Sequence, residues 1–408
     1  MNKTRLKKYA KLIARVGANV KRGQEVVINA GLDQPEFVKA VADECYRAGA
    51  KKVSVEWSYM PLTASNVKYC SEDVLGTLEG WQIEKWEHQA KVLPCKIFIM
   101  SDDPDGLSGI DQGKYARAMA QRSKLIKPIR SKMENKYQWC IAAVPGKEWA
   151  KKVFPGERAS VAVEKLWDAI LDASRVTDDP TEAWREHNEK LAERSAYLNS
   201  LGIKELHYKA SNGTELKVGL IPEALFMAGG EYTEGTRIYF NPNIPSEEIF
   251  TSPMKGEAEG IVYSSRPLSY GGQLIDKFWI RFEGGKAVDC GAEKNCEMLR
   301  EILKMDEGAA YLGEVALVPH SSPIQKSGLL FYNTLFDENA ACHLALGRGF
   351  TNVLKDYEKY TEEEAHAKGI NDSVVHEDFM IGTADMCITA VCADGKEVRI
   401  FENGEFTF

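Results

Sequence analysis

The sequence predicts two successive folds: an N-terminal α/β domain with a parallel sheet, then a β-rich C-terminal domain of α+β type. In the first part, apolar strand candidates alternate with helical patterns at the spacing of βα units. In the later part, alternating runs meet at Asn-Gly, Asp-Gly and Gly-Gly pairs, which is typical of antiparallel hairpins. A chain of 408 residues is long enough for two such domains, each with its own core.

The N-terminal domain is expected over residues 1–178, as an α/β scaffold. Its strands are rich in Val and Ile and are separated by long crossovers, which favours a parallel sheet covered on both faces. Between the first two strands, Phe37, Val41, Cys45 and Ala48 recur on one helical face. The strand candidates are EVVINA, KVSVEW, KIFIMSDD and QWCIAAVPG. No GxGxxG or Walker-type loop follows the first strand, so a scaffold and substrate wall is favoured over a nucleotide site.

The C-terminal domain is expected over residues 179–408, as a β-rich domain. A polar stretch, SRVTDDPTEAW, marks the boundary, and Pro180 introduces a long helix through about Ser200. Hairpins are predicted in ELHYKASNGTELKVGL, IRFEGGKAVDC and ITAVCADGKEVRIFENGEF.

Composition excludes several classes of protein. A formal net charge of −8 argues against a partner bound through nucleic-acid phosphates. No segment approaches the ~18–20 apolar residues that cross a bilayer, so no membrane partner is expected. The nine cysteines are odd in number and show no CxxC spacing, which favours reduced core thiols and a cytoplasmic location.

Residues with metal-ligand character concentrate in the second half. HEDFM places an imidazole and a carboxylate two residues apart, and therefore on one face of a strand. GEVALVP is a strand candidate with one acid, and NIPSEEIFTSP carries paired acids. DENAACHLALG is expected to pass from a loop into a helix of small residues. The candidates are Glu248, Glu314, Glu338, His343, His376 and Asp378.

Each candidate alone has an ordinary structural alternative. Glu247 and Glu248 could lie in the first turn of a helix, and Glu314 could be exposed on an edge strand. A helical His343 could be a structural histidine, and it would meet Glu338 only if that residue lies in the preceding loop. Asp378 could simply orient a core His376. Together, however, carboxylates and imidazoles without thiolates are the ligands of hydrolytic Zn, Co, Mn or Mg sites, often in pairs.

The segments NIPSEEIFTSP, GEVALVP, LFYNTLFDENAACHLALG and HEDFMIG resemble, in order and spacing, signature segments of the thermophilic-type metallo-aminopeptidase family of aminopeptidase T, aminopeptidase S and PepS. The resemblance extends over essentially the whole chain. It implies an aminopeptidase that removes N-terminal amino acids from peptides by a water activated at two divalent metal ions. It also implies that residues 179–408 are the catalytic, metal-binding domain, and that the protein is a homodimer acting on peptides with a free N-terminus.

The resemblance also implies the ligands and their roles. Glu314 is the expected bridging ligand and a catalytic residue, and Glu338 is expected to be a ligand or a proton shuttle. The full set implied as metal ligands is Glu248, Glu314, Glu338, His343, His376 and Asp378. The substrate's amino group is expected to bind a metal or a carboxylate such as Glu247.

One position departs from the family pattern. Phe350 stands where the family commonly has a Tyr, so a phenol that could donate to a developing oxyanion is missing. Tyr332 or Tyr270 could serve instead. The alternative function is a catalytically weakened homologue that only binds peptides or metals. A two-metal phosphoesterase is disfavoured because no basic cluster lies near the candidate ligands.

Overall fold

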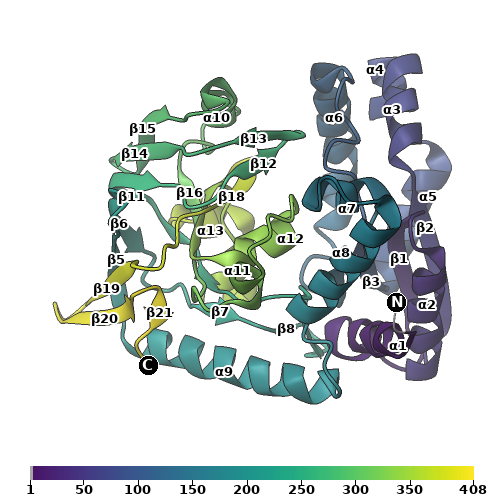
Figure 1. Ribbon diagram of the computed structural model, residues 1–408, viewed down its shortest axis with the longest axis horizontal. Helices are drawn as coiled ribbons and strands as arrows, with labels where there is room; N and C mark the ends of the chain where they lie inside the picture. Colours follow the sequence, from purple (N-terminus) through teal and green to yellow (C-terminus); the bar gives the residue numbers. More distant parts are fainter. Residues whose placement is uncertain (1–2) are drawn as a thin grey trace. The chain divides into compact units, whose positions relative to one another are not determined.

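The computed structural model describes residues 3–408 and contains a parallel four-stranded sheet in its N-terminal part (Figure 1). The strand order is β2-β1-β3-β4, and every pairing is parallel. All four strands predicted from the sequence are confirmed. Their bounds are β1 (Glu25–Gly31), β2 (Lys52–Ser58), β3 (Cys95–Met100) and β4 (Trp139–Ala143).

Helices connect these strands, as the apolar periodicity predicts. In α2, Phe37, Val41 and Cys45 are buried on the predicted face, and Gly49 ends the helix in a left-handed conformation with φ 103°. The bounds are α1 (Lys3–Leu12), the π-helical turn η1 (Ile13–Gly17), α2 (Pro35–Ala48), α3 (Met60–Tyr69), α4 (Glu72–Gly76), α5 (Gly80–Val92), α6 (Gln112–Arg130), α7 (Lys147–Val153), α8 (Ala159–Ala173) and α9 (Pro180–Ser200). None of the helices among residues 3–408 combines the length and apolar character that a membrane span requires.

The chain divides into two compact units that differ slightly from the predicted domains. The first contains the residues up to Trp184 together with Gly230–Pro245, and the second contains Arg185–Gly229 and Ser246–Phe408. The segment Gly230–Pro245 joins the first unit because Ile141 of β4 donates to Pro242 O and accepts from Ile244 N. This segment carries the short strands β8 (Glu231–Tyr232) and β9 (Tyr239–Phe240). The predicted division into domains between residues 178 and 179 stays a prediction.

An eight-stranded antiparallel sheet organises the second unit, in the order β15-β14-β11-β6-β5-β19-β20-β21. The three predicted hairpins are confirmed within it. The Gly284-Gly285 and Asn403-Gly404 pairs both have positive φ, as tight hairpin turns require. The bounds are β5 (Ile203–Lys209), β6 (Glu215–Leu220), β11 (Pro253–Tyr263), β14 (Trp279–Glu283), β15 (Lys286–Gly291), β19 (Cys387–Cys392), β20 (Glu397–Glu402) and β21 (Glu405–Phe406).

A second, five-stranded antiparallel sheet of this unit has the order β18-β17-β16-β10-β7. Its strands are β7 (Met227–Ala228), β10 (Ile249–Thr251), β16 (Leu312–Leu317), β17 (His343–Gly347) and β18 (His376–Met380). The remaining elements are the hairpin β12 (Leu268–Tyr270) and β13 (Gln273–Ile275), the helices α10 (Cys296–Ile302), α11 (Pro323–Ser327), α12 (Thr334–Asp337) and α13 (Glu362–Ala367), and the 3₁₀ turns η2 (Glu338–Ala340), η3 (Thr351–Val353) and η4 (Tyr357–Lys359).

The main core of the second unit contains residues from both of its large sheets. Leu206 and Ile388 of the eight-stranded sheet belong to the same buried cluster as Val315, Leu344 and Phe379 of the five-stranded sheet. The fold class predicted from the sequence, a parallel α/β part followed by a β-rich part, is therefore confirmed.

Candidate functional site

The five-stranded sheet has one apolar face and one face that carries ionisable groups. Side chains alternate between the two faces of a strand. Val315, Leu344 and Phe379 therefore enter the core, while their sequence neighbours Glu314, His343 and Asp378 project from the opposite face. The polar face is nonetheless buried, with exposed fractions of 4% for Glu314, 1% for His343 and 8% for Asp378.

The strand register brings the acids of this face into one row. Glu314 of β16 pairs with Ala345 of β17, and Ala345 pairs in turn with Asp378 of β18. The register is irregular between Leu312 and Glu314, as in a β-bulge. Such irregularities re-aim side chains. The methyl group of Ala345 leaves open the space between the two carboxylates.

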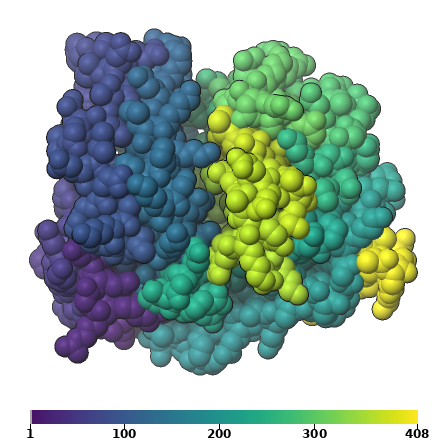
Figure 2. All heavy atoms as spheres, turned by 180° about the vertical axis from the view of Figure 1, so that it is seen from behind, coloured from purple at the N-terminus to yellow at the C-terminus, as the bar shows by residue number. Residues whose placement is uncertain are grey.

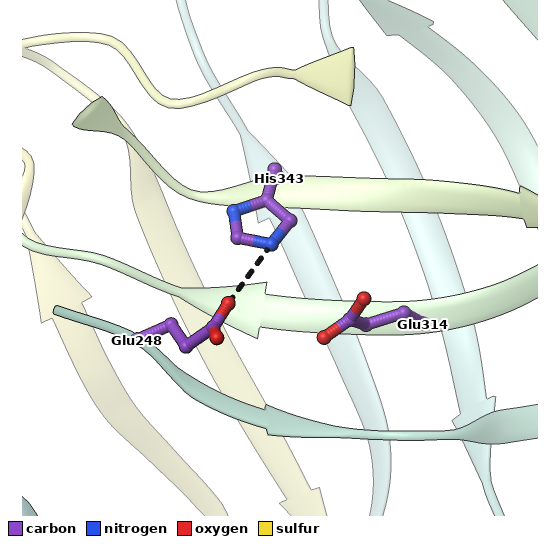
Figure 3. Close-up of side chains that lie close together, drawn as sticks. All are labelled: Glu248, Glu314 and His343. Atoms are coloured by element: carbon purple, nitrogen blue, oxygen red, sulfur yellow. Dashed lines mark ion pairs between the residues drawn. The ribbon is translucent and has the colours of Figure 1, made fainter. Parts of the chain in front are cut away.

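Two groups of three potential ligands form here, and Glu314 belongs to both; all members are buried except His376, which is partly exposed. The first contains Glu248, Glu314 and His343, and the second contains Glu314, His376 and Asp378. Within each group the potential ligand atoms all lie within 4.8 Å of one another. Figure 3 shows the first group, with Glu248 and Glu314 on either side of the His343 imidazole. A third group, Glu362, His366 and Asp372, has two of its three members exposed.

Both imidazoles point their Nε2 atoms at carboxylates. His343 Nε2 lies 3.3 Å from Glu248 Oε2, the contact dashed in Figure 3. His376 Nε2 lies 3.3 Å from Glu314 Oε2 and 3.3 Å from Asp378 Oδ1. The other ring nitrogen of each histidine faces a backbone carbonyl: Nδ1 of His376 is 2.7 Å from Arg348 O, and Nδ1 of His343 is 3.3 Å from Ala341 O. Carbonyls that accept from Nδ1–H leave Nε2 free to act as a ligand.

Glu338 lies in η2, directly after α12, and is only partly buried. It lines a cavity of about 30 Å³ together with Asp378, Tyr332 and Leu268 of the β12–β13 hairpin, among others. Burial of the carboxyl group, reinforced by the negative charges of Asp378, Glu248 and Glu314, raises the pKa of Glu338 well above its ordinary value. A carboxyl group in this environment is suited to hold a proton.

The pKa values of the other groups reflect the crowding of acids and imidazoles. Burial raises the pKa of Glu314, although the contact with His376 opposes the shift. Burial alone would lower the pKa of His343, but the nearby carboxylates of Glu248 and Glu314 raise it to about 9. Burial alone would raise the pKa of Asp378, but the contact with His376 lowers it. Each shift is thus the balance between burial and the contacts of the carboxylates with the imidazoles.

The donor set fits divalent cations. It consists of carboxylate oxygens and imidazole nitrogens, which suit Zn, Mn, Co and Mg. Asp378 Oδ1 is buried and accepts no hydrogen bond from the residues that the structure describes. Its close contact is the ion pair with His376 Nε2, at 3.3 Å. Buried carboxylates normally pair with cations or coordinate metals.

The local structure corrects one expectation from the sequence and decides several of the structural alternatives. His343 begins strand β17 instead of lying on a small-residue helix, because Leu344 and Leu346 alternate with the small Ala345 and enter the core. Glu338 accordingly lies in a 3₁₀ turn instead of a loop. Glu248 directly precedes β10 and is not in the first turn of a helix. Glu314 is on a central strand of its sheet and not on an edge.

Glu247 supports the site through its neighbours. Its carboxylate lies 4.0 Å from Nε2 of His187 on α9, and its expected contact with the substrate's amino group stays a prediction. Its backbone N donates to Asn339 Oδ1 over 2.6 Å, which fixes the position of the adjacent Glu248. The sequence patterns gave no indication of His187 or Asn339, since neither lies in a recognisable ligand spacing.

The groups that orient the two histidines could not be found from the sequence. They are the backbone carbonyls of Arg348 and Ala341, and every residue has such a carbonyl group. Of the two tyrosines that could replace the missing phenol, Tyr332 lines the cavity beside Glu338. Tyr270 OH instead faces Met305 Sδ at 3.9 Å.

Comparisons with known proteins identify the family of this chain. The chain matches the family described as thermophilic metalloprotease (M29) over residues 2–406. It is 39% identical to aminopeptidase AmpS of Bacillus subtilis over 99% of this chain and 98% of the relative, and 40% identical to aminopeptidase 2 of Geobacillus stearothermophilus over the same shares. The solved structure of wild-type AmpT from Thermus thermophilus superposes with a TM-score of 0.91 at 37% identity and covers 100% of both chains. The resemblance inferred from the four sequence segments is thus confirmed, and the chain belongs to the thermophilic metalloprotease (M29) family.

Proposed function

We propose that this chain is a metal-dependent aminopeptidase that removes N-terminal amino acids from peptides and uses two divalent metal ions. Membership of a metalloprotease family supports the metal, and relatives named aminopeptidases support the exopeptidase activity. The proposed number of ions rests on one observation: two groups of potential ligand atoms share Glu314. A carboxylate shared between two ligand groups is the arrangement that a two-metal site requires.

Each group would hold one ion. Glu248 and His343 would bind the first ion, His376 and Asp378 would bind the second, and Glu314 would bridge them. When bound, two divalent cations supply a nucleophilic water at neutral pH and polarise the substrate carbonyl. Zn, Co, Mn and Mg all suit these donors, so availability would decide which ion is used.

The chain's own residues would position and protonate the substrate. Glu338 is the candidate for the group that takes a proton from the attacking water and delivers it to the leaving amine, because it lines the cavity beside Asp378. Glu338 belongs to neither of the two ligand groups, which favours the proton-shuttle role over the ligand role. Hydrogen bonds from the two Nδ1 atoms to backbone carbonyls would hold both imidazoles in one orientation.

Tyr332 is the candidate donor in place of the missing phenol at position 350, because it lines the same cavity as Glu338 and Asp378. A homodimer and a cytoplasmic location remain predictions from the sequence. The alternative of a weakened, binding-only homologue makes a distinct prediction: metals would bind, but no peptide would be cleaved.

One experiment separates these possibilities. The purified protein is assayed for metal per chain, stripped with a chelator and reloaded separately with Zn, Co, Mn or Mg. Release of p-nitroaniline from leucine p-nitroanilide and from its N-acetylated form is then measured. We expect about two ions per chain, activity only in the reloaded protein, and cleavage only of the substrate with a free amino group. Metal binding without cleavage of either substrate would support the binding-only alternative, and equal cleavage of both would exclude an aminopeptidase.

A further inference from the structure

Two aromatic rings adjoin the ligand groups on the polar face of the five-stranded sheet. The rings of Phe250 and Phe350 meet edge-to-face with centroids 5.5 Å apart and an interplanar angle of 72°. The Phe350 ring also lies 4.9 Å from the imidazole of His376. Both phenylalanines are partly exposed. An apolar surface that is not fully covered therefore borders the imidazole of a proposed metal ligand.

The backbone fixes this aromatic pair relative to the ligands. Phe250 follows Glu248 by two residues and pairs in register with Ala316 of β16, which itself lies two residues from Glu314. Phe250 thus occupies the ligand-bearing face. The backbone N of Phe350 donates to Oγ of the buried Ser252 over 2.8 Å, which ties the segment after β17 to the end of β10.

An apolar cluster supports the pair from behind. Phe250 and Phe350 both pack against it, as do Met227 and Met254. The buried members of the cluster are Ile221, Val353, Leu354, Ala365 and Ile370. Part of the cluster comes from η3 and α13, whose segment is yellow-green on the surface shown in Figure 2. The rings are therefore held in place and cannot turn away from His376 without disturbing packed side chains.

We propose that Phe250 and Phe350 form the wall against which the side chain of the substrate's first residue packs, so that the enzyme prefers large apolar first residues. This inference rests on the proposed aminopeptidase function. In an aminopeptidase, the carbonyl under attack belongs to the first residue, whose side chain begins only about 2.5 Å from that carbonyl carbon. A leucine or phenylalanine side chain that leaves the ligand groups past His376 meets the Phe350 ring.

The same wall gives Phe350 a role that a missing phenol does not explain. If position 350 mattered only as a lost oxyanion donor, Phe350→Tyr would raise kcat for all substrates by a similar factor. If the ring is a wall, substitutions at position 350 change the ratio between substrates. One methylene in an apolar pocket is worth about 10–200-fold in kcat/KM.

The test measures kcat/KM for leucine, phenylalanine and alanine p-nitroanilides with the metal-loaded wild type, Phe350→Ala, Phe350→Leu and Phe250→Ala. We expect the leucine-to-alanine ratio to fall about 10-fold or more in both alanine variants, and Phe350→Leu to recover most of it. Phe406→Ala, which removes a partly buried ring from β21, is the matched control and should leave the ratio unchanged. Equal losses for all three substrates, or a ratio unchanged in the position 350 variants, would overturn the proposal.

A binding measurement keeps this inference separate from the proposed function. Calorimetric titration of the metal-loaded wild type and Phe350→Ala with leucine hydroxamate and alanine hydroxamate requires no turnover. Tighter binding of the leucine compound by the wild type, lost in Phe350→Ala, supports the wall even if no peptide is cleaved. Equal affinity of the wild type for both compounds would contradict it even if the aminopeptidase activity is present.

Discussion

Nε2 of His376 lies 3.3 Å from Oε2 of Glu314, although the two residues are on strands β18 and β16, which are not neighbours in the sheet. The strand between them, β17, presents Ala345 at the position that pairs with both Glu314 and Asp378. A methyl group is short enough for side chains to meet above it. The two groups of potential ligands can therefore share Glu314 only because the middle strand carries a small residue at this position.

Enlarging this residue should close the space between the acids. We expect Ala345→Val to lower the metal content to less than one ion per chain and to cost about 1–3 kcal/mol of stability through overpacking. Ala390→Val, at a buried alanine of β19 in the main core, is the control. It should cost a similar amount of stability and keep the metals. Full metal content in Ala345→Val, measured by elemental analysis, would contradict this account.

Glu314 should be the least replaceable of the proposed ligands because it belongs to both groups. In Glu314→Gln the amide keeps the shape but loses the charge, so we expect at most one tightly bound ion and a fall in kcat/KM beyond the ~10–100-fold typical of residues that only orient ligands. Glu397→Gln, an exposed strand residue of the same unit, should behave like the wild type. Metal analysis and hydrolysis of leucine p-nitroanilide measure both effects, and wild-type activity in Glu314→Gln would refute the bridging role.

Gly347 should be required for the position of His376, its register partner on β18. Gly347 has φ 95°, and a Cβ there would lie 2.2 Å from Val375 O. The left-handed conformation alone costs about 1–2 kcal/mol in a residue with a side chain. We expect Gly347→Ala to lower the Tm and also to weaken metal binding, since it displaces the backbone directly before His376.

Gly395→Ala serves as the comparison for that variant. Gly395 has φ 83°, but no atom lies within 4 Å of the place that a Cβ would take, so the variant reports backbone strain without a clash. Its Tm should fall by a smaller amount, and its metal content should be unchanged. If the Tm and the metal content of Gly347→Ala fall only as much as those of Gly395→Ala, the contact with Val375 is unimportant.

Lys96 of β3 should make the free energy of unfolding rise with pH in the alkaline range. It is 6% exposed and lies over the rings of Trp86 and Tyr137. Burial lowers the pKa of Lys96 to about 8, although Glu56 opposes the shift. Between pH 8 and the unfolded pKa of 10.5, the unfolded chain binds more protons, so the stability of the folded chain rises with pH in this window.

The measurement is the free energy of unfolding of the wild type minus that of Lys96→Met, at several pH values from about 7 to 10.5. We expect this difference to move in favour of the wild type by on the order of 2–3 kcal/mol across the window. Val67→Met, which changes a buried residue without removing an ionisable group, is the control and should show no comparable slope. If the difference in unfolding free energy between the wild type and Lys96→Met does not change with pH, Lys96 remains charged throughout the window.

The sequence alone determined most of the secondary structure and the chemical type of the site. Val- and Ile-rich runs with helical crossovers were sufficient for β1 to β4, and Gly-containing turns were sufficient for the hairpins, because these signals are local. The i, i+2 spacing of His376 and Asp378 placed both on one face of a strand. The family resemblance then supplied the aminopeptidase function.

Only the tertiary structure decided how the candidates meet. The register across β16, β17 and β18 aligned Glu314, Ala345 and Asp378. The segment from His343 to Gly347, whose small residues suggested a helix, is a strand because both of its faces are buried. Backbone carbonyls oriented the histidines, and Phe350 came to lie against His376 and Phe250. Pairing between strands distant in the sequence depends on packing of the whole sheet, and no local pattern of residues encodes it.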